Sequence, residues 1–151
     1  MVSGTSLKTK SPAISVLLPV YNAEKYIAIA IESISKQTFK DFEFIIIDDC
    51  SSDKSWEIVK KYSKQDKRII ALRNKHNLGG CKTLNKGLKL TKGKYVAGVD
   101  HDDWSYSDKL EKQFKFMESN PDVGIVGGVM ELINKAGEVI GRRKYNLSDR
   151  E

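Results

Sequence analysis

The stretch that decides the fold class is YVAGVDHDDW, residues 95–104. Its first five residues are apolar and partly β-branched, which is typical of a strand buried on both faces. Asp100, Asp102 and Asp103 then follow within four residues. Hard carboxylate oxygens at the carboxyl end of a strand suit Mg²⁺ or Mn²⁺, and open α/β sheets bind ligands at that end. The alternative is a solvated acidic turn in which Asp103 or Ser105 caps the next helix.

Outward from this stretch, strand and helix patterns alternate along the chain. Short apolar runs predict strands at 14–18, 42–47 and 68–72, and helical spacing of apolar residues predicts helices at 23–36, 53–64, 81–90 and 108–119. A further strand is expected at 123–129, followed by a hairpin of 130–133 with 138–141. At least four alternations predict an α/β fold with a mostly parallel sheet flanked by helices.

Local signals predict how some of these elements begin and end. Pro19 is expected to break the first strand, Asn22 to cap the following helix, and Gly93 to end the helix before the acidic stretch. The length of 151 residues fits one domain. We expect it at residues 13–141, after a disordered lead-in at 1–12 and before a polar tail at 142–151.

Composition and charge limit the function classes. The net charge is +6, and residues 54–94 hold 13 Lys or Arg against the two acids Glu57 and Asp66. Such a basic segment suits an anionic substrate, a nucleic acid or an anionic membrane surface, although basic and aromatic residues do not interleave as in base-stacking proteins. The chain has no signal-peptide core or apolar run long enough to span a membrane, which predicts a cytoplasmic location. Cys50 and Cys81 fit no metal spacing.

Three polar turns follow predicted strands: 19–22, 48–53 and 100–103. Carboxyl ends of parallel strands share one edge of a sheet, so these turns are expected to converge there. The sequence has no G-x-G-x-x-G dinucleotide motif, no P-loop and no nucleophile elbow around a serine. What remains is a nucleotide held by polar turns, with its diphosphate bridged to carboxylates by a divalent cation.

Six short motifs then give a family resemblance. They are PVYN at 19–22, IDDCSSD at 47–53, NLG at 77–79, LNKG at 84–87, KGKY at 92–95 and DHDD at 100–103, and LEKQ at 110–113 continues the match. Their order and spacing over about residues 14–130 resemble the family 2 glycosyltransferases, in which the acidic turn is the DXD motif. The resemblance implies a GT-A (Rossmann-like) fold and inverting transfer of a sugar from a UDP-sugar to a saccharide or lipid-linked acceptor.

The resemblance also implies roles for single residues. Those expected to bind the nucleotide-sugar are Pro19, Tyr21, Asn22, Asp48, Asp49 and Asp102. Among them Asp49 would accept a hydrogen bond from the base, usually uracil, although the N1–H of guanine fits a carboxylate as well. Asp103 would ligate Mn²⁺ or Mg²⁺ on the diphosphate. Lys82 is added from its charge alone, as a cation near the phosphates.

Two departures from the family pattern matter. Cys50 replaces the usual glycine of its turn, so a side chain must tolerate that backbone. The family's general base lies downstream, beyond Glu151, so no catalytic base is assigned and the chain is expected to be a donor-binding part truncated on its C-terminal side. The alternatives are a non-catalytic nucleotide-sugar-binding module and a receiver-type phosphotransfer domain using Asp48, Asp49 and Asp103. An acceptor at the inner membrane face, with peripheral membrane association, is a further expectation from the family.

Overall fold

A computed structural model describes residues 11–134 and 136–143 of the chain. It divides the chain into two compact units, residues 1–111 and residues 112–151. Of the predicted lead-in at 1–12, residues 1–10 lie outside the described residues. The predicted tail begins two residues too early, since residues 142 and 143 belong to a strand, and residues 144–151 lie outside the description.

The first unit holds four parallel strands in the order β3-β2-β1-β4. Its elements alternate as predicted: β1 Ile14–Val20, α1 Ile27–Ser35, β2 Phe42–Asp48, α2 Ser55–Gln65, β3 Ile69–Arg73, α3 Gly80–Leu88, β4 Tyr95–Gly98 and the first turn of α4, Lys109–Ser119. The mostly parallel sheet flanked by helices is therefore confirmed.

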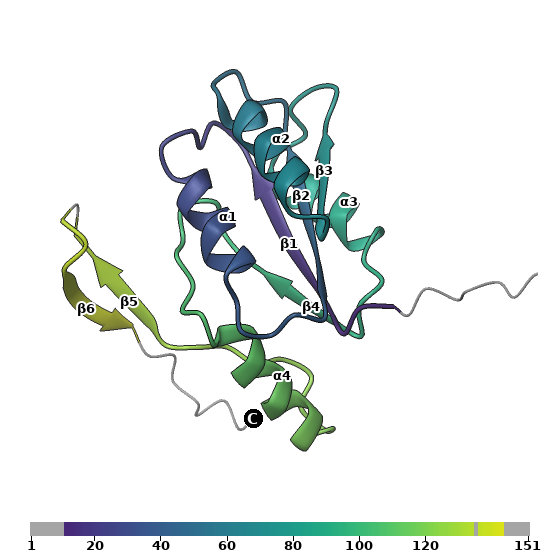
Figure 1. The fold of residues 1–151 in the computed structure, drawn as a ribbon, viewed down its shortest axis with the longest axis vertical. Helices are drawn as coiled ribbons and strands as arrows, with labels where there is room; N and C mark the ends of the chain where they lie inside the picture. The colour runs from purple at the N-terminus through teal and green to yellow at the C-terminus, as the bar shows by residue number, and fades with distance from the viewer. Residues whose placement is uncertain (1–10, 135, 144–151) are drawn as a thin grey trace, which may run out of the picture. The chain divides into compact units, whose positions relative to one another are not determined.

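The core lies on the two central strands, β1 and β2. Phe44 and the three isoleucines that follow it are fully buried, as continuous apolar runs in a parallel sheet should be. The connections through α1 and α2 run in one direction across the sheet, and the connection through α3 runs back. Right-handed crossovers therefore place α3 on the opposite face (Figure 1). A glycine at position 87 lets α3 approach closely, because a Cβ there would lie 2.3 Å from Leu17 Cδ1.

Pro19 does not end the first strand, contrary to the prediction. It pairs with Ile47 inside β1. The odd-numbered residues of β1 face β4, since Leu17 accepts a hydrogen bond from the N–H of Val99 at 3.1 Å. The last residue of β4, Gly98, pairs with Leu17. Pro19 therefore has no neighbouring strand on its nitrogen side, and the missing N–H removes no hydrogen bond of the sheet.

Two other local predictions were wrong. Asn22 does not cap a helix, because α1 begins only at Ile27 and the Asn22 side chain bonds to a neighbouring turn instead. Gly93 does not end α3, which stops at Leu88. Glycine is needed at position 93 because a Cβ there would lie 2.5 Å from the backbone nitrogen of Ser15.

The second unit holds the rest of α4 and an antiparallel hairpin. The hairpin pairs β5, Met130–Ile133, with β6, Val139–Arg143, and confirms the prediction there. The strand predicted at 123–129 was wrong, since those residues have no regular structure and Ile125 is 90% exposed. Three glycines in seven residues leave few side chains to pack and raise the entropic cost of ordering a strand. Within the described ranges, no helix combines the length and the apolar character that crossing a membrane requires.

Candidate functional site

The candidate site lies at the carboxyl edge of the parallel sheet. The chain steps from β1 outward through β2 to β3, and then returns to place β4 on the other side of β1. This reversal makes a topological switch point between β1 and β4, the position where open α/β sheets bind ligands. Tyr21 and Asn22 follow β1 there, and the acidic turn, residues 100–103, follows β4. Asp49 and Asp103 therefore follow strands that end at the same edge, as predicted.

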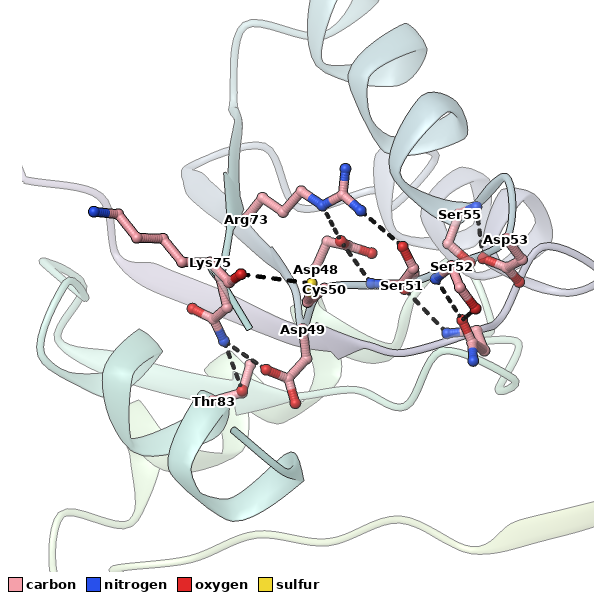
Figure 2. Close-up of polar contacts among 12 residues, drawn as sticks. Asp48, Asp49, Cys50, Ser51, Ser52, Asp53, Ser55, Arg73, Lys75 and Thr83 are labelled. Carbon is pink, nitrogen blue, oxygen red and sulfur yellow. Dashed lines mark hydrogen bonds and ion pairs between the residues drawn. The ribbon is translucent and has the colours of Figure 1, made fainter. Parts of the chain in front are cut away.

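The turns after β1 and β2 are joined by hydrogen bonds across 29 to 30 residues of sequence. The N–H of Asn22 donates to Ser51 Oγ at 3.0 Å, and the N–H of Ser52 donates back to Asn22 Oδ1 at 2.9 Å. Asn22 adopts a φ of 48°, in the left-handed region that Asn tolerates better than most residues. The N–H of Asp49 bonds to the carbonyl of Val20 at 2.7 Å. The first two predicted turns therefore form one connected structure (Figure 2).

Further hydrogen bonds join the residues after Asn22 to the start of α2. The N–H of Glu24 donates to Asp53 Oδ2 at 2.9 Å, while the N–H of Lys54 donates to the Glu24 carboxylate at 3.0 Å. The N–H of Ala23 donates to the buried Ser55 hydroxyl at 2.8 Å. These reciprocal bonds satisfy backbone N–H groups that have no partner in a strand or helix.

Asp48, which was predicted to bind the nucleotide-sugar, is fully buried at the end of β2. Its Oδ2 lies 3.0 Å from Arg73 Nε and accepts the N–H of Ser51 at 3.1 Å. Arg73 also donates to the carbonyl of Ser51 at 2.7 Å, so its guanidinium contacts the turn at two points (Figure 2). The other oxygen, Oδ1, is buried and has no hydrogen-bond partner among the described residues. Cys50, inside this turn, has a φ of 61°, which confirms the expectation that its side chain tolerates a glycine-like backbone.

Asp49, which was predicted to accept a hydrogen bond from the nucleobase, is only 2% exposed. Its Oδ1 accepts hydrogen bonds from Asn74 Nδ2 at 2.7 Å and from the N–H of Leu78 at 2.9 Å, and its Oδ2 accepts the N–H of Gly79 at 2.8 Å. Burial works to raise the pKa of Asp49, but these donors and the Thr83 hydroxyl outweigh it and lower the pKa below its ordinary value. Asp49 therefore holds the loop that leads into α3.

Arg73 and Asn74 are site residues that the sequence analysis missed. Arg73 is the last residue of β3, and Asn74 directly follows it. Asn74 also accepts a hydrogen bond from Lys86 Nζ at 2.6 Å and donates to Thr83 Oγ1 at 2.9 Å. A signal was present, because Asn74 is a polar residue at the carboxyl end of a strand, like the three turns that were recognised.

The aspartates of the acidic turn, unlike the buried Asp48 and Asp49, are exposed to solvent. Asp103 is exposed, and the side chain of Asp102 is 59% exposed. Partial burial, followed by the charges of Asp100 and Asp102, raises the pKa of Asp103, although Lys109 and His101 oppose this shift. Asp102 Oδ1 lies 3.8 Å from His101 Nδ1, too far for a hydrogen bond. The positive charge near the turn, from Lys109 and His101, does not outweigh the effects that raise the pKa of Asp103.

The carboxylates of the acidic turn can hold a cation only if the bound ligand supplies further oxygen atoms. Throughout the described ranges, no three His, Cys, Asp or Glu side chains come together as a metal site. Carboxylate oxygens of Asp103 and its neighbours suit Mg²⁺ or Mn²⁺. Partial burial first, and the charges of Asp100 and Asp102 second, raise the pKa of Asp103, and a cation would offset both effects. The carboxylates of the acidic turn are therefore compatible with a cation that is shared with a diphosphate.

The remaining predicted residues lie close to the same edge. Tyr21 is 47% exposed directly after β1, and Pro19 lies half-buried two residues before it. Lys82 is exposed in the first turn of α3. The structure thus brings Tyr21, Asn22, Asp48 and Asp49 into neighbouring turns, and leaves Lys82 on the surface.

Comparisons with known proteins agree with this geometry. The model of glycosyl transferase family 2 matches residues 15–147. An uncharacterised glycosyltransferase of Methanocaldococcus jannaschii is 43% identical over 131 residues, covering 85% of this chain and 45% of that protein. The Escherichia coli protein WfaP, a UDP-Glc:α-D-GlcNAc-diphosphoundecaprenol β-1,3-glucosyltransferase, is 38% identical over 106 residues, covering 70% of this chain and 41% of that protein. The crystal structure of S. aureus TarS 1–349 in complex with UDP is 35% identical with a TM-score of 0.67, covering 72% of this chain and 32% of that one.

The chain belongs to glycosyl transferase family 2. Its parallel sheet with flanking helices matches the GT-A fold of its structural neighbours, as the sequence predicted. The chain spans less than half the length of these relatives.

Proposed function

We propose that this chain is the donor-binding part of an inverting glycosyltransferase that uses a UDP-sugar and a divalent cation. The observation that carries the proposal is the arrangement of three polar turns at one switch point, with three exposed aspartates in the acidic turn. The likeness to S. aureus TarS, whose structure was solved with UDP, supports uridine as the nucleoside.

In this proposal the turns after β1 and β2 bind the nucleoside. The half-exposed ring of Tyr21 would pack against the base or ribose, and Asn22 keeps its turn fixed through its bonds to Ser51 and Ser52. The Asp49 carboxylate would accept the imide N–H of uracil. Because three backbone and amide N–H groups already bond to it, the base would have to share this carboxylate with the loop before α3.

The acidic turn would hold the diphosphate end of the donor. Asp103 is the proposed cation ligand, and Asp102 the residue nearest the ribose or sugar. When bound, the cation supplies positive charge that stabilises the departing diphosphate. Lys109 adds a fixed positive charge to the same cluster, since both Asp103 and Asp100 interact with it electrostatically.

The acceptor is proposed to be a saccharide or a lipid-linked saccharide. The name of WfaP, whose acceptor is linked to diphosphoundecaprenol, supports this class. The basic segment at 54–94 would favour an anionic membrane surface at the cytoplasmic face. The catalytic base remains unassigned within residues 1–151.

A thermal-shift screen tests the donor site. UDP, GDP, CDP and TDP are each added with and without Mn²⁺ to the wild type, to Asp103→Ala and to Asp122→Ala, a control that removes an exposed acid from the second unit. We expect a Mn²⁺-dependent rise with UDP that Asp103→Ala abolishes and Asp122→Ala preserves. An equal response to all four nucleotides, or no response, contradicts the proposal. A non-catalytic binding module would give the same shifts without sugar transfer by the full-length protein.

A further inference from the structure

The side chain of Gln37, just past the end of α1, is fully buried. Its amide nitrogen donates to the carbonyl of Ser33 at 3.0 Å and to the carbonyl of Tyr106 at 2.7 Å, and its oxygen accepts the N–H of Leu110 at 2.9 Å. All polar groups of a buried amide therefore have partners. Two of the three partners lie 69 and 73 residues away, in the segment that leaves the acidic turn.

The bond to Leu110 also completes the start of a helix. Leu110 is the second residue of α4, and the first N–H groups of a helix have no partner within it. Gln37 supplies the acceptor from a distant part of the chain, in the way a local N-cap residue would. The start of α4 is thus fixed by the end of α1.

Neighbours of Gln37 add further bonds to the same segment. The N–H of Thr38 donates to the carbonyl of Ser107 at 2.7 Å, and its hydroxyl donates to the Glu111 carboxylate at 2.7 Å. The buried Ser33 hydroxyl accepts the N–H of Ser105 at 3.2 Å. Residues 105–111, which we call the exit segment, are therefore fastened to the end of α1 at several points.

The acidic turn itself depends on its two ends. Its entrance is held by the bond from the N–H of Val99 to the carbonyl of Leu17 at 3.1 Å. Inside the turn, the N–H of Asp103 reaches the carbonyl of Asp100 at a long 3.3 Å. Three neighbouring carboxylates repel one another, so a turn with so few bonds of its own needs a fixed exit.

We propose that Gln37 is the positioning residue of the acidic turn: by holding the exit segment, it keeps Asp102 and Asp103 at the switch point. The effect on cation binding rests on the proposed function, whereas the effect on the position of the turn does not. When a residue that orients a metal ligand without touching the metal is removed, the metal affinity typically falls about 10- to 100-fold.

Gln37→Met tests this, because methionine has a similar length but cannot donate to the carbonyls of Ser33 and Tyr106 or accept the N–H of Leu110. Ser15→Ala is the matched control. The Ser15 hydroxyl is also fully buried, donating to Glu43 at 2.6 Å and accepting the N–H of Gly93 at 2.8 Å, but it lies at the opposite edge of the sheet. Ser33→Ala is a milder second variant, which removes the acceptor for the N–H of Ser105 and the local bond from the Ser33 hydroxyl to the carbonyl of Ala30.

The first measurement needs no ligand. Trp104 directly follows Asp103, and its ring packs edge-on against Tyr106 with centroids 4.7 Å apart. With 5-fluorotryptophan, we expect ¹⁹F NMR to show a shifted or broadened Trp104 signal in Gln37→Met, a smaller change in Ser33→Ala and no change in Ser15→Ala. The Trp56 signal, assigned by Trp56→Phe, serves as the internal reference. Equal changes at both tryptophans, or an unchanged Trp104 signal in Gln37→Met and Ser33→Ala, overturn the proposal.

The second measurement is Mn²⁺ affinity at saturating UDP, followed by electron paramagnetic resonance. We expect Gln37→Met to weaken it about tenfold or more, while Ser15→Ala leaves it within about twofold at a comparable urea midpoint. Equal weakening in both variants overturns the proposal. If the wild type binds no Mn²⁺ with UDP, the donor-site proposal fails, and the ¹⁹F result still decides the role of Gln37.

Discussion

The turn after β2 and the turn after β4 each present a pair of adjacent aspartates at the same edge of the sheet, but the protein holds them in opposite ways. Asp48 and Asp49 are 0% and 2% exposed and bond to a guanidinium and to several N–H groups. Asp102 and Asp103 are exposed. The pKa of Asp49 is lowered by its donors, whereas burial and neighbouring carboxylates raise the pKa of Asp103.

The difference shows how the same residue pair takes two roles. A carboxylate surrounded by protein donors stabilises the fold and fixes the backbone around it. An exposed carboxylate whose neighbours are mostly carboxylates gains from a bound cation. We therefore expect substitutions in the first turn to change stability, and substitutions in the second turn to change ligand binding.

The largest expected effect on stability comes from Arg73→Met. It leaves the fully buried Asp48 carboxylate without its cation, and breaking a buried ion pair from one side lowers the free energy of unfolding by about 3 kcal/mol. Urea denaturation measures this. The double variant Asp48→Asn with Arg73→Met should lose less, because no charge is left buried. A loss in Arg73→Met below about 1 kcal/mol would show that water replaces the guanidinium at this site.

Asp49→Asn should follow, with a loss of about 2 kcal/mol, because an amide offers one acceptor oxygen where the loop before α3 requires two. Asp103→Asn is its matched partner and should change stability by less than about 0.5 kcal/mol, since the side chain is exposed. Urea denaturation of both variants tests the comparison directly. Equal losses would contradict the different roles of the two turns.

Acid titration sharpens the same contrast. Because the pKa of Asp49 in the folded protein lies below its ordinary value of 3.8, its stabilising contribution is present above pH 3.8 and is lost as the pH falls through the folded value. The unfolding free energies of the wild type and Asp49→Asn should therefore converge in this acid range. Parallel curves would mean that the Asp49 pKa is not lowered by folding.

A smaller effect of opposite sign is expected for Cys50→Gly. Cys50 has a φ of 61°, a region that costs an L-residue about 1–2 kcal/mol. Glycine relieves that cost but loses more entropy on folding, so the expected net gain in unfolding free energy is about 0.5–1 kcal/mol. Chemical denaturation checks it, and a net loss would mean that the contact of the Cys50 thiol with the Lys75 carbonyl, at 3.7 Å, matters more than the backbone strain.

The sheet, and the edge where the turns of the candidate site lie, could be predicted because both depend on local patterns. Apolar runs followed by polar turns mark the carboxyl ends of strands, and parallel strands place those ends together. Predictions failed where a distant neighbour decides the outcome. Pro19 stays within β1 because β4 ends beside Leu17, and Asn22 bonds to a turn 29 to 30 residues away and does not cap α1.

The partners of the site residues were also beyond local reasoning. Arg73 meets Asp48 across 25 residues, and Gln37 meets Leu110 across 73. Such contacts leave no periodicity in the sequence, so Gln37 looks like an ordinary connection between two elements until the fold brings the exit segment to it. The predicted strand at 123–129 failed for a local reason, its three glycines, which outweighed the apolar pattern.

The most direct test of the account is paramagnetic broadening of backbone amide NMR signals by substoichiometric Mn²⁺ with UDP present. If the turns after β1, β2 and β4 share one diphosphate and one cation, the signals of Asn22, Cys50 and Asp103 should broaden together, and that of Gly93 at the opposite edge should stay sharp. Broadening confined to the acidic turn, or equal broadening at Gly93, would contradict a shared donor site.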